Sequence, residues 1–370
     1  MISFNNPLRT GKELSYVQDA FERNQFSGNG HYTKLCEAEL EALTQTSRCL
    51  LTSSCSHALD MCAILLDIKP DDEIIMASYN FVSAANAFVN RGAKVCFVDI
   101  DPNSMNINVQ LIEEAINPNT KAILAMHYGG VACDMFQLKK LADKYKLYLV
   151  EDAAHCIDAY HKESHLGTIG DLGTISFHAS KNIHCGEGGA LLINNKDFIE
   201  RAEIIREKGT NRAAFNKGLV SKYTWVDLGS SYIMSEISAA FLYAQIQSLS
   251  KVKNQRKALF EEYHNHFSLH IDEKDLSPNN TGSNYHLFYL KVNNRKALIA
   301  DLKEKAVEAY FHYIPLHSSE AGLKHAYFSG TDVYTSKESE RLLRLPLYCD
   351  LNNQSYIIEA VSDYLKYGNR

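Results

Sequence analysis

The sequence predicts an α/β fold: an open, mixed sheet of about seven strands with helices on both faces, followed by a small C-terminal α+β domain. Short, nearly continuous apolar runs recur between residues 48 and 193, which is typical of strands covered on both faces of a sheet. Helical patterns separate the early runs, whereas the later runs follow one another directly. The direct succession predicts a sheet that is mixed rather than wholly parallel.

Each predicted element follows from its own pattern. The strands, in chain order, are expected at residues 48–52, 73–77, 94–99, 122–126, 147–151, 173–177 and 189–193. Helical periodicity predicts helices such as 56–66, 136–145 and a long one from residue 234 to about 267. After a polar loop at 278–283, strands at 285–292 and 308–314 flank a helix over 295–305. We therefore expect a large domain over residues 1–245 and a small domain over residues 246–370.

The composition excludes several classes of protein. A formal charge of −6 leaves no basic field for nucleic acid, and no apolar stretch approaches the ~20 residues that span a bilayer. The first residues lack the charged-then-apolar order of a signal peptide. The nine cysteines are scattered singly, several of them in apolar runs, which is typical of reduced core residues. We expect a cytoplasmic protein that binds neither nucleic acid nor membrane, and the sequence predicts no metal site.

Lys181 carries the clearest chemical signal. It follows one apolar strand and precedes another, Gly189-Ala-Leu-Leu-Ile193, and a lysine held between buried strands loses solvation, which favours its neutral, nucleophilic amine. Schiff-base chemistry requires such an amine. Most lysines are solvated surface groups, so this position alone is a weak signal. Asp152 adds weight, because it ends an earlier apolar run and could keep a pyridine nitrogen protonated.

Further candidate residues follow strand ends, where open α/β sheets bind ligands. Ser53-Ser-Cys-Ser-His57 opens a helix, and free amides with serine hydroxyls make an anion site there, although an ordinary serine N-cap is the commoner explanation of this segment alone. Phe81 and His155 could lie on the two faces of a flat ring, although a single aromatic is more often core. Ser176 points to the phosphate side. Together these residues predict a site for pyridoxal 5′-phosphate (PLP).

These motifs resemble those of the DegT/DnrJ/StrS nucleotide-sugar aminotransferases, which have the aspartate-aminotransferase fold (PLP fold type I). The resemblance runs over essentially the whole chain and is densest at Val150-Glu-Asp-Ala-Ala154, Ser176-Phe-His-Ala-Ser-Lys-Asn182 and Gly186-Glu-Gly-Gly189. It implies that Lys181 and Asp152 are catalytic, with Lys181 bound covalently to PLP and Asp152 paired with the pyridinium nitrogen. The remaining cofactor-binding residues that it implies are Ser56, His57, Phe81, His155, Ser176 and Ser231.

Ser231 is expected to contribute to the active site of the partner subunit. In this family the partner reaches the phosphate through a segment that here reads Gly229-Ser-Ser-Tyr-Ile-Met234, in which Ser231 replaces an asparagine. The resemblance therefore implies a homodimer with composite active sites. It also implies substrate-binding roles for Gly28, Gly30, Glu187, Arg212, His312, Tyr313 and His317.

Within the family, four stretches of the chain resemble the transaminases that form dTDP-4-amino-4,6-dideoxygalactose for surface polysaccharides such as O-antigen; they are residues 201–212, 222–225, 311–317 and 339–346. They imply amino transfer from L-glutamate to C4 of dTDP-4-keto-6-deoxy-D-glucose. The loop Asn182-Ile-His-Cys185, however, is one residue shorter than expected for the galactose-forming enzyme and lies beside the reacting carbon. A product of opposite C4 stereochemistry, with the gluco configuration, is therefore an alternative, as is another nucleotide-linked ketosugar.

Two functions of other classes also occur on this fold. A sugar 3-dehydratase uses the same cofactor but has histidine at the lysine position, so Lys181 argues against it. A non-enzymatic regulator that senses a ligand would not need Lys181, Asp152 and the phosphate residues together. The sequence thus favours an aminotransferase over both.

Overall fold

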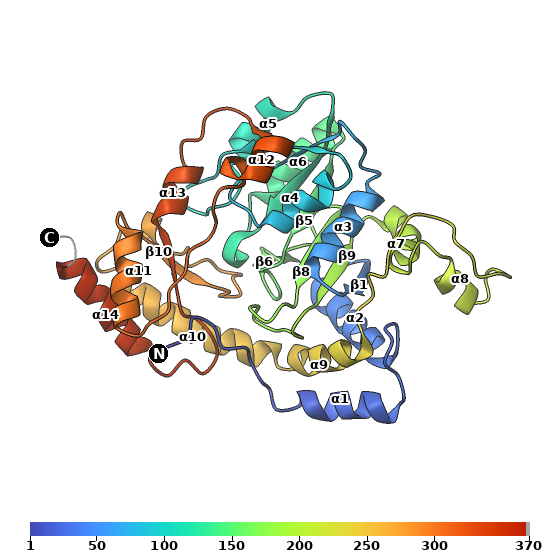
Figure 1. The fold of residues 1–370 in the computed structure, drawn as a ribbon, viewed down its shortest axis with the longest axis horizontal. Helices are drawn as coiled ribbons and strands as arrows, with labels where there is room; N and C mark the ends of the chain where they lie inside the picture. The colour runs from blue at the N-terminus through green and yellow to red at the C-terminus, as the bar shows by residue number, and fades with distance from the viewer. Residues whose placement is uncertain (368–370) are drawn as a thin grey trace.

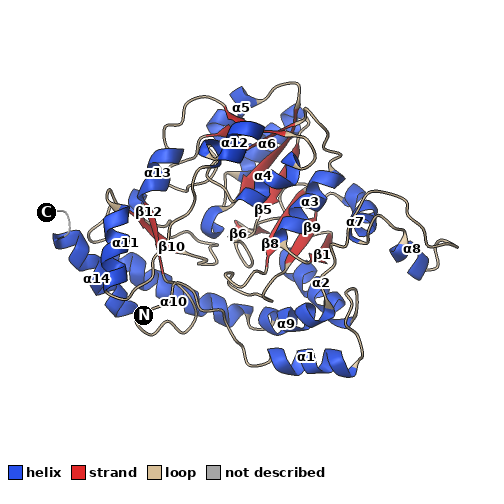
Figure 2. Cartoon of the chain, in the orientation of Figure 1, coloured by secondary structure: helices blue, strands red, loops and turns tan. Residues whose placement is uncertain are grey.

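An eight-stranded mixed sheet forms the centre of the molecule (Figures 1 and 2). The structure is a computed structural model and describes residues 1–367. Its strands lie in the order β1 (Arg48–Thr52), β9 (Gly189–Ile193), β8 (Leu172–Ser176), β5 (Tyr148–Asp152), β4 (Thr120–Met126), β2 (Glu73–Ala77), β3 (Lys94–Val98) and β11 (Ala326–Phe328). Strand β9 pairs antiparallel with both β1 and β8, whereas the pairs from β8 to β11 are parallel.

All seven predicted strands form, with ends that shift by at most two residues, and the mixed character of the sheet is confirmed. The eighth strand, β11, comes from the C-terminal part of the chain and was not predicted. It pairs in parallel with β3, with Ala326 opposite Val95. Three residues are too few to show a strand periodicity, so the sequence alone gives no sign of it.

Alternate side chains of the central strands enter two different cores, as the period of two residues requires. On one face, Ile74 and Met76 pack with the helices α3 (Cys55–Leu65), α4 (Val82–Val89) and α7 (Ile199–Arg206). On the other, Ile75 and Ala77 pack with α5 (Ile112–Ala115) and α6 (Met135–Tyr145). At the far end of the sheet, β1, β8 and β9 pack against α1 (Glu13–Glu22), α2 (His31–Thr44) and α9 (Glu236–Ile246). Helices therefore cover both faces, and the strand ends are held in a rigid frame.

Two predictions in the C-terminal part are wrong. The long helix is two helices, α9 and α10 (Leu249–Phe267), which are separated at Gln247 and Ser248. Residues 308–314 form no strand, and the partner of β10 (Phe288–Lys291) is instead the antiparallel β12 (Leu342–Leu345). The aromatic residues at 310–313 suggested a strand because aromatics favour strands, but His312 and Tyr313 line a cavity instead.

The remaining elements are short or peripheral. They are β6 (Tyr160–His161), β7 (Ser164–His165), α8 (Arg212–Asn216), α11 (Arg295–Glu304), α12 (Glu320–His325), α13 (Thr335–Arg341) and α14 (Gln354–Tyr367). A separate core joins α10, α11 and α14 to β10 and β12. Figure 1 shows α8 on an arm that extends away from the rest of the chain. Among residues 1–367, no helix is both long and apolar enough to cross a membrane. The domain division at residues 245 and 246 stays a prediction.

Candidate active site

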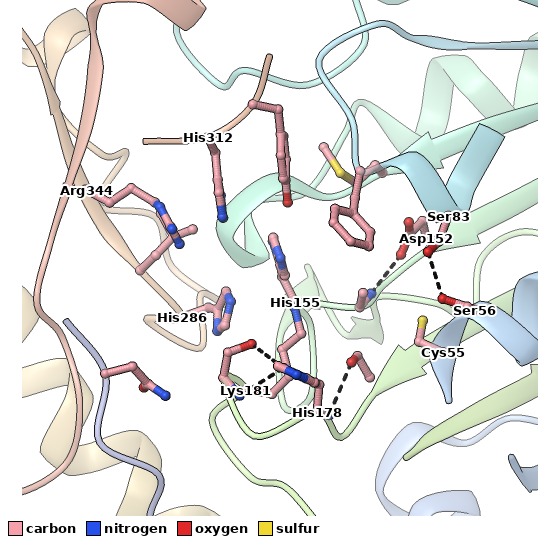
Figure 3. A pocket seen from close by; sticks show the side chains of 18 of the residues that line it. Cys55, Ser56, Ser83, Asp152, His155, His178, Lys181, His286, His312 and Arg344 are labelled. Atoms are coloured by element: carbon pink, nitrogen blue, oxygen red, sulfur yellow. Dashed lines mark hydrogen bonds between the residues drawn. The ribbon is translucent and has the colours of Figure 1, made fainter. Parts of the chain in front are cut away.

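A cavity of about 700 Å³ opens at the carboxyl ends of three parallel strands. The last residues of these strands, Met126 of β4, Asp152 of β5 and Ser176 of β8, all line it. Figure 3 shows that side chains from the sheet and from the C-terminal part of the chain converge there. Nine of the predicted site residues line the cavity: Ser56, Phe81, Asp152, His155, Ser176, Lys181, Glu187, His312 and Tyr313.

Lys181 lies in the connection between β8 and β9. This connection is closed by backbone hydrogen bonds, in which Phe177 N–H donates to Gly188 O at 2.8 Å and Lys181 N–H donates to His178 O at 2.9 Å. Burial lowers the pKa of Lys181, against the opposing influence of Cys55 and Asp152, and the positive charge of Arg344 adds to the lowering. The geometry thus favours the neutral amine that a nucleophile and base requires.

Asp152 is 4 % exposed and accepts a hydrogen bond from Ala154 N–H at 3.1 Å. Burial raises the pKa of this carboxyl, while the Ala154 N–H and the charges of Lys181 and His127 act in the opposite direction. A cationic partner in the cavity would therefore be needed to hold Asp152 firmly ionised. A protonated pyridine nitrogen is such a partner.

A buried ion pair supports the strand behind Asp152. His127 Nε2 lies 2.9 Å from Glu151 Oε2, and the backbone N–H of His127 donates to Asp152 O. Burial alone would lower the pKa of His127, but its contacts with Cys133 and Glu151 outweigh burial and raise it to about 10. Glu151 also accepts the backbone N–H groups of Gly167, Ile169 and Gly170. The carboxylate of Asp152 therefore projects from a strand that is fixed by charge-assisted hydrogen bonds.

The N-terminus of α3 forms the opposite side of the cavity. Ser54 is its N-cap and accepts the His57 N–H at 3.1 Å, and Ser56 Oγ donates to Ser83 Oγ at 2.7 Å. Strand β9 approaches this turn so closely that a Cβ on Gly189 would lie 2.3 Å from Cys55 N. Together with Ser176, these hydroxyls and the first amides of α3 provide donors for an anion such as a phosphate.

Three histidines gather beside Lys181. The rings of His155 and His286 are 4.4 Å apart, and the ring of His312 stacks on Tyr313 at 4.2 Å with an interplanar angle of 5°. Burial, with the positive charge of Lys181, lowers the pKa of all three well below the usual value. They are therefore neutral at pH 7 and give this wall of the cavity flat, uncharged surfaces.

These residues fit PLP. The cavity contains a half-buried amine, a buried carboxylate and a hydroxyl-lined helix N-terminus, which match the aldehyde, ring nitrogen and phosphate of the cofactor. In Figure 3, Asp152 and Ser56 lie on one side of His155, and His286 and Arg344 lie on the other. Phe81 and His155 both line the space where the ring would lie.

Six predicted site residues do not line the cavity of this chain. His57 binds Ser53 at 2.6 Å and packs on Tyr232, and His317 binds Ser78 and Asp332. Arg212 lies on α8 and is 3.5 Å from Glu207. Gly28 and Gly30 contact Met234 and Glu236 near α2, and Ser231 is exposed at the base of the arm. Their assigned roles stay predictions.

The sequence prediction did not name several residues that the structure brings into the cavity. They include Cys55, Ser83, His286 and Arg344. His286 Nδ1 lies 2.8 Å from Asn182 Oδ1, and the two residues are 104 positions apart in the chain, a separation that no local pattern reveals. Arg344 did carry a signal, because it interrupts the apolar strand Leu342-Leu-Arg-Leu345, and a charge in such a strand is seldom structural alone.

Comparison with known proteins identifies the family of this chain. A model of the DegT/DnrJ/EryC1/StrS aminotransferase family matches residues 8–362. An uncharacterized protein of Methanocaldococcus jannaschii is 34% identical, with 82% of each chain covered, and the spore coat polysaccharide biosynthesis protein SpsC of Bacillus subtilis is 29% identical over 99% of this chain and 97% of its own. The aminotransferase TlmJ from Streptoalloteichus hindustanus is 27% identical, and its crystal structure matches with a TM-score of 0.90 over 99% of both chains. The chain therefore belongs to the DegT/DnrJ/EryC1/StrS aminotransferase family and is a PLP-dependent aminotransferase of fold type I.

Proposed function

We propose that the enzyme transfers the amino group of L-glutamate to C4 of dTDP-4-keto-6-deoxy-D-glucose, and that the product is a dTDP-4-amino-4,6-dideoxy sugar. The observation that carries this proposal is the position of His312 and Tyr313. They belong to one of the stretches that resemble dTDP-sugar transaminases, and they line the same cavity as Lys181 and Asp152. The similarity to SpsC, a spore coat polysaccharide biosynthesis protein, supports a surface polysaccharide such as O-antigen as the destination. We further propose a cytoplasmic homodimer.

In this proposal each side chain has one task. When bound, PLP supplies an electron-withdrawing ring that stabilises negative charge at the Cα of the donor. Lys181, freed from the cofactor, takes the Cα proton of glutamate and later delivers a proton to C4 of the sugar. Asp152 keeps the ring nitrogen protonated, and Phe81 and His155 hold the ring in position between them. Ser54, Ser56 and Ser176 hold the phosphate at the N-terminus of α3.

The product of the purified enzyme tests the proposal. The PLP-loaded protein is incubated with glutamate and dTDP-4-keto-6-deoxyglucose, and the sugar is analysed by NMR. We expect an amine at C4 and an equimolar amount of 2-oxoglutarate. The H3–H4 coupling constant then distinguishes an axial from an equatorial amine, which decides between the galacto and the gluco product. Loss of the C3 hydroxyl without amine transfer would instead identify a dehydratase and refute the proposal.

A further inference from the structure

Residues 311–317, here called the strap, carry two side chains of the cavity wall. His312 and Tyr313 stack on each other with their ring centres 4.2 Å apart, and both line the cavity; Figure 3 shows His312 there. Apart from one turn of 3₁₀ helix at Leu316–Ser318, the strap contains no regular structure. Its backbone groups must therefore find partners in other segments, and these contacts position the cavity wall.

The strap is bound to the residue that follows strand β2. Leu316 N–H donates to Ser78 O at 3.0 Å, and His317 N–H donates to Ser78 Oγ at 3.0 Å. The imidazole of His317 returns to the same hydroxyl, with Nδ1 2.7 Å from Ser78 Oγ, while its Nε2 lies 3.3 Å from Asp332 Oδ2. Because a carboxylate only accepts hydrogen bonds, the ring hydrogen lies on Nε2, and Nδ1 accepts from the Ser78 hydroxyl.

Ser78 is the fixed end of this contact. It is 0 % exposed and directly follows β2, which pairs with β3 on one side and with β4 on the other. Phe81, which is expected to lie on the cofactor ring, comes three residues later, and its ring is 6.3 Å from that of Tyr313. The imidazole of His317 therefore connects a rigid strand end, beside Phe81, to the strap that carries Tyr313.

Ser78, His317 and Asp332 are the residue types of a hydrolase triad, but here they cannot reach a substrate. None of the three lines the cavity, and Ser78 is fully buried. The Ser78 hydroxyl also accepts the backbone N–H of His317, which ties it to the strap. The arrangement is therefore suited to holding two segments together rather than to attacking a bound molecule.

We propose that His317 is a positioning residue: through Ser78 it holds His312 and Tyr313 where they contact the acceptor sugar. This inference rests on the proposed function, because it takes a nucleotide-linked ketosugar as the acceptor. The donor half of the reaction depends on Lys181 and Asp152, which belong to the sheet and its loop and not to the strap. Loss of the Ser78–His317 contact should therefore weaken acceptor binding and leave the donor half-reaction intact.

Two substitutions separate the two nitrogen atoms of the imidazole. The amide of asparagine reaches about as far as Nδ1, and that of glutamine about as far as Nε2. His317→Asn thus keeps a partner for Ser78, whereas His317→Gln keeps one for Asp332 only. We expect His317→Gln to raise the Kd of dTDP-4-keto-6-deoxyglucose for the pyridoxamine form of the enzyme about 10-fold, the usual effect of leaving one buried hydroxyl unpaired. His317→Asn should stay closer to the wild type.

His325→Gln is the matched control, because His325 is an exposed histidine in the same part of the chain; it should leave the Kd unchanged. The glutamate half-reaction, followed by cofactor absorbance, should keep its wild-type rate in every variant. Hydrogen–deuterium exchange of the PLP-loaded enzyme gives a readout that needs no sugar. The amides of Leu316 and His317 donate to Ser78, so peptides that contain them should exchange faster in His317→Gln than in the wild type.

Each outcome decides one question. An unchanged ketosugar Kd in His317→Gln would overturn the proposal, and so would equal losses in the asparagine and glutamine variants. A glutamate half-reaction that slows as much as sugar binding weakens would show a merely structural role. If the wild type does not bind the ketosugar, the proposed acceptor is wrong, and the exchange of the strap alone judges the contact with Ser78. If His317→Gln does not fold, Ser78→Ala, which removes the same hydroxyl contacts, is judged by the same criteria.

Discussion

At the scale of single residues, burial in the cavity disfavours the charged forms of both Lys181 and Asp152, which suits the role of the lysine but not that of the carboxylate. Burial lowers the pKa of the lysine and raises the pKa of the carboxyl, so it favours the neutral form of each. The reaction needs a neutral amine but an ionised carboxylate. In the proposed arrangement a protonated ring nitrogen beside Asp152 would restore its charge, so that the cofactor-bound site would hold both groups in the forms that the reaction needs.

Replacing Lys181 tests the assignment of the base. We expect Lys181→Ala to bind pyridoxamine phosphate and yet to fail at turnover, because the ring and phosphate contacts remain while the base is lost. Cofactor retention is measured by absorbance and turnover by 2-oxoglutarate release. Lys139→Ala, which removes a surface lysine paired with Asp143, should keep wild-type turnover. Substantial turnover in Lys181→Ala would rule out the assignment.

Replacing Asp152 tests the partner of the ring nitrogen. A neutral amide cannot stabilise the pyridinium charge, so Asp152→Asn should lower kcat by about two orders of magnitude or more, equivalent to about 3 kcal/mol. Steady-state kinetics measure the loss, and the surface variant Asp143→Asn serves as the control. Near-normal rates would mean that another group holds the ring nitrogen.

The neutral histidines predict a pH dependence of stability. The pKa of His155, His286 and His312 is lowered in the folded protein, so below about pH 6.5, the usual pKa of histidine, the unfolded chain binds protons that the folded chain does not. The contribution of these histidines to the free energy of unfolding is therefore fully present above this pH. It is lost as the pH decreases, by up to about 1.4 kcal/mol per pH unit for each histidine.

Denaturant unfolding of the cofactor-free protein between pH 5 and 7 measures this slope. His165, whose pKa burial lowers to about 4, contributes to the same slope. His312→Gln should therefore reduce the slope by the contribution of one histidine, while a substitution of the exposed His270 should not change it. His127 acts in another window: its raised pKa, about 10, adds stability below pH 6.5 that is lost as the pH rises through 10. An unchanged slope in His312→Gln would show that this ring takes up a proton in the folded state.

At the scale of elements, the site depends on how closely β9 approaches the first turn of α3. This approach is possible because Gly189 has no side chain, and a Cβ there would overlap Cys55 N. The serine hydroxyls of that turn therefore stay at the carboxyl edge of the sheet. Gly189 is also the first residue after the β8–β9 connection that carries Lys181. Its contact with Cys55 therefore brings the end of that connection against the first turn of α3.

Gly189→Ala should disturb this contact. The added methyl must displace α3 or β9, and overpacking of this kind costs about 1–3 kcal/mol. We expect a lower Tm and faster loss of PLP during dialysis. Gly11→Ala is the control, because a Cβ at Gly11 would meet no atom within 4 Å and only its φ of +89° is unfavourable. Equal effects of both variants on PLP retention would contradict the role of Gly189.

The elements also show what a single sequence can predict. Apolar runs such as Gly189–Ile193 are unambiguous because both faces are buried, so β9 and its neighbours could be placed to within two residues. Strand β11 is too short, and the break at Gln247 is hidden because the helical pattern continues across it. In the site, Lys181 and Asp152 could be found because they end or follow apolar strands. His286 could not, because only the folding of distant segments brings it to His155.

At the scale of the whole molecule, the arm that carries α8 extends away from the rest of the chain (Figure 1). Its side chains include Tyr223, which is 53 % exposed, and Trp225, which is 75 % exposed, and aromatic residues are enriched at interface cores. Ser231 lies at the base of this arm and does not reach the cavity of its own chain. Both observations support the proposed two-fold dimer, in which the arm contacts the neighbouring site.

Mixing two inactive variants tests whether the sites are shared. Ser231→Tyr places a bulky group at an exposed position, so its own chain should fold, whereas a neighbour's phosphate site would be blocked. After subunit exchange with Lys181→Ala, one site of each heterodimer carries native Lys181 and native Ser231. Random pairing should restore roughly a quarter of the wild-type activity. If mass spectrometry demonstrates heterodimers and activity does not recover, the shared-site proposal is refuted.

The pairing of β11 with β3 has a consequence for biosynthesis. Until residues 326–328 have left the ribosome, the outer edge of β3 has no partner along the stretch that they later cover. Unpaired strand edges recruit other chains, and the other strands of the sheet emerge from the ribosome before β11 does. If those strands pair first, the nascent chain exposes an aggregation-prone edge at β3 until residues 326–328 emerge and cover it.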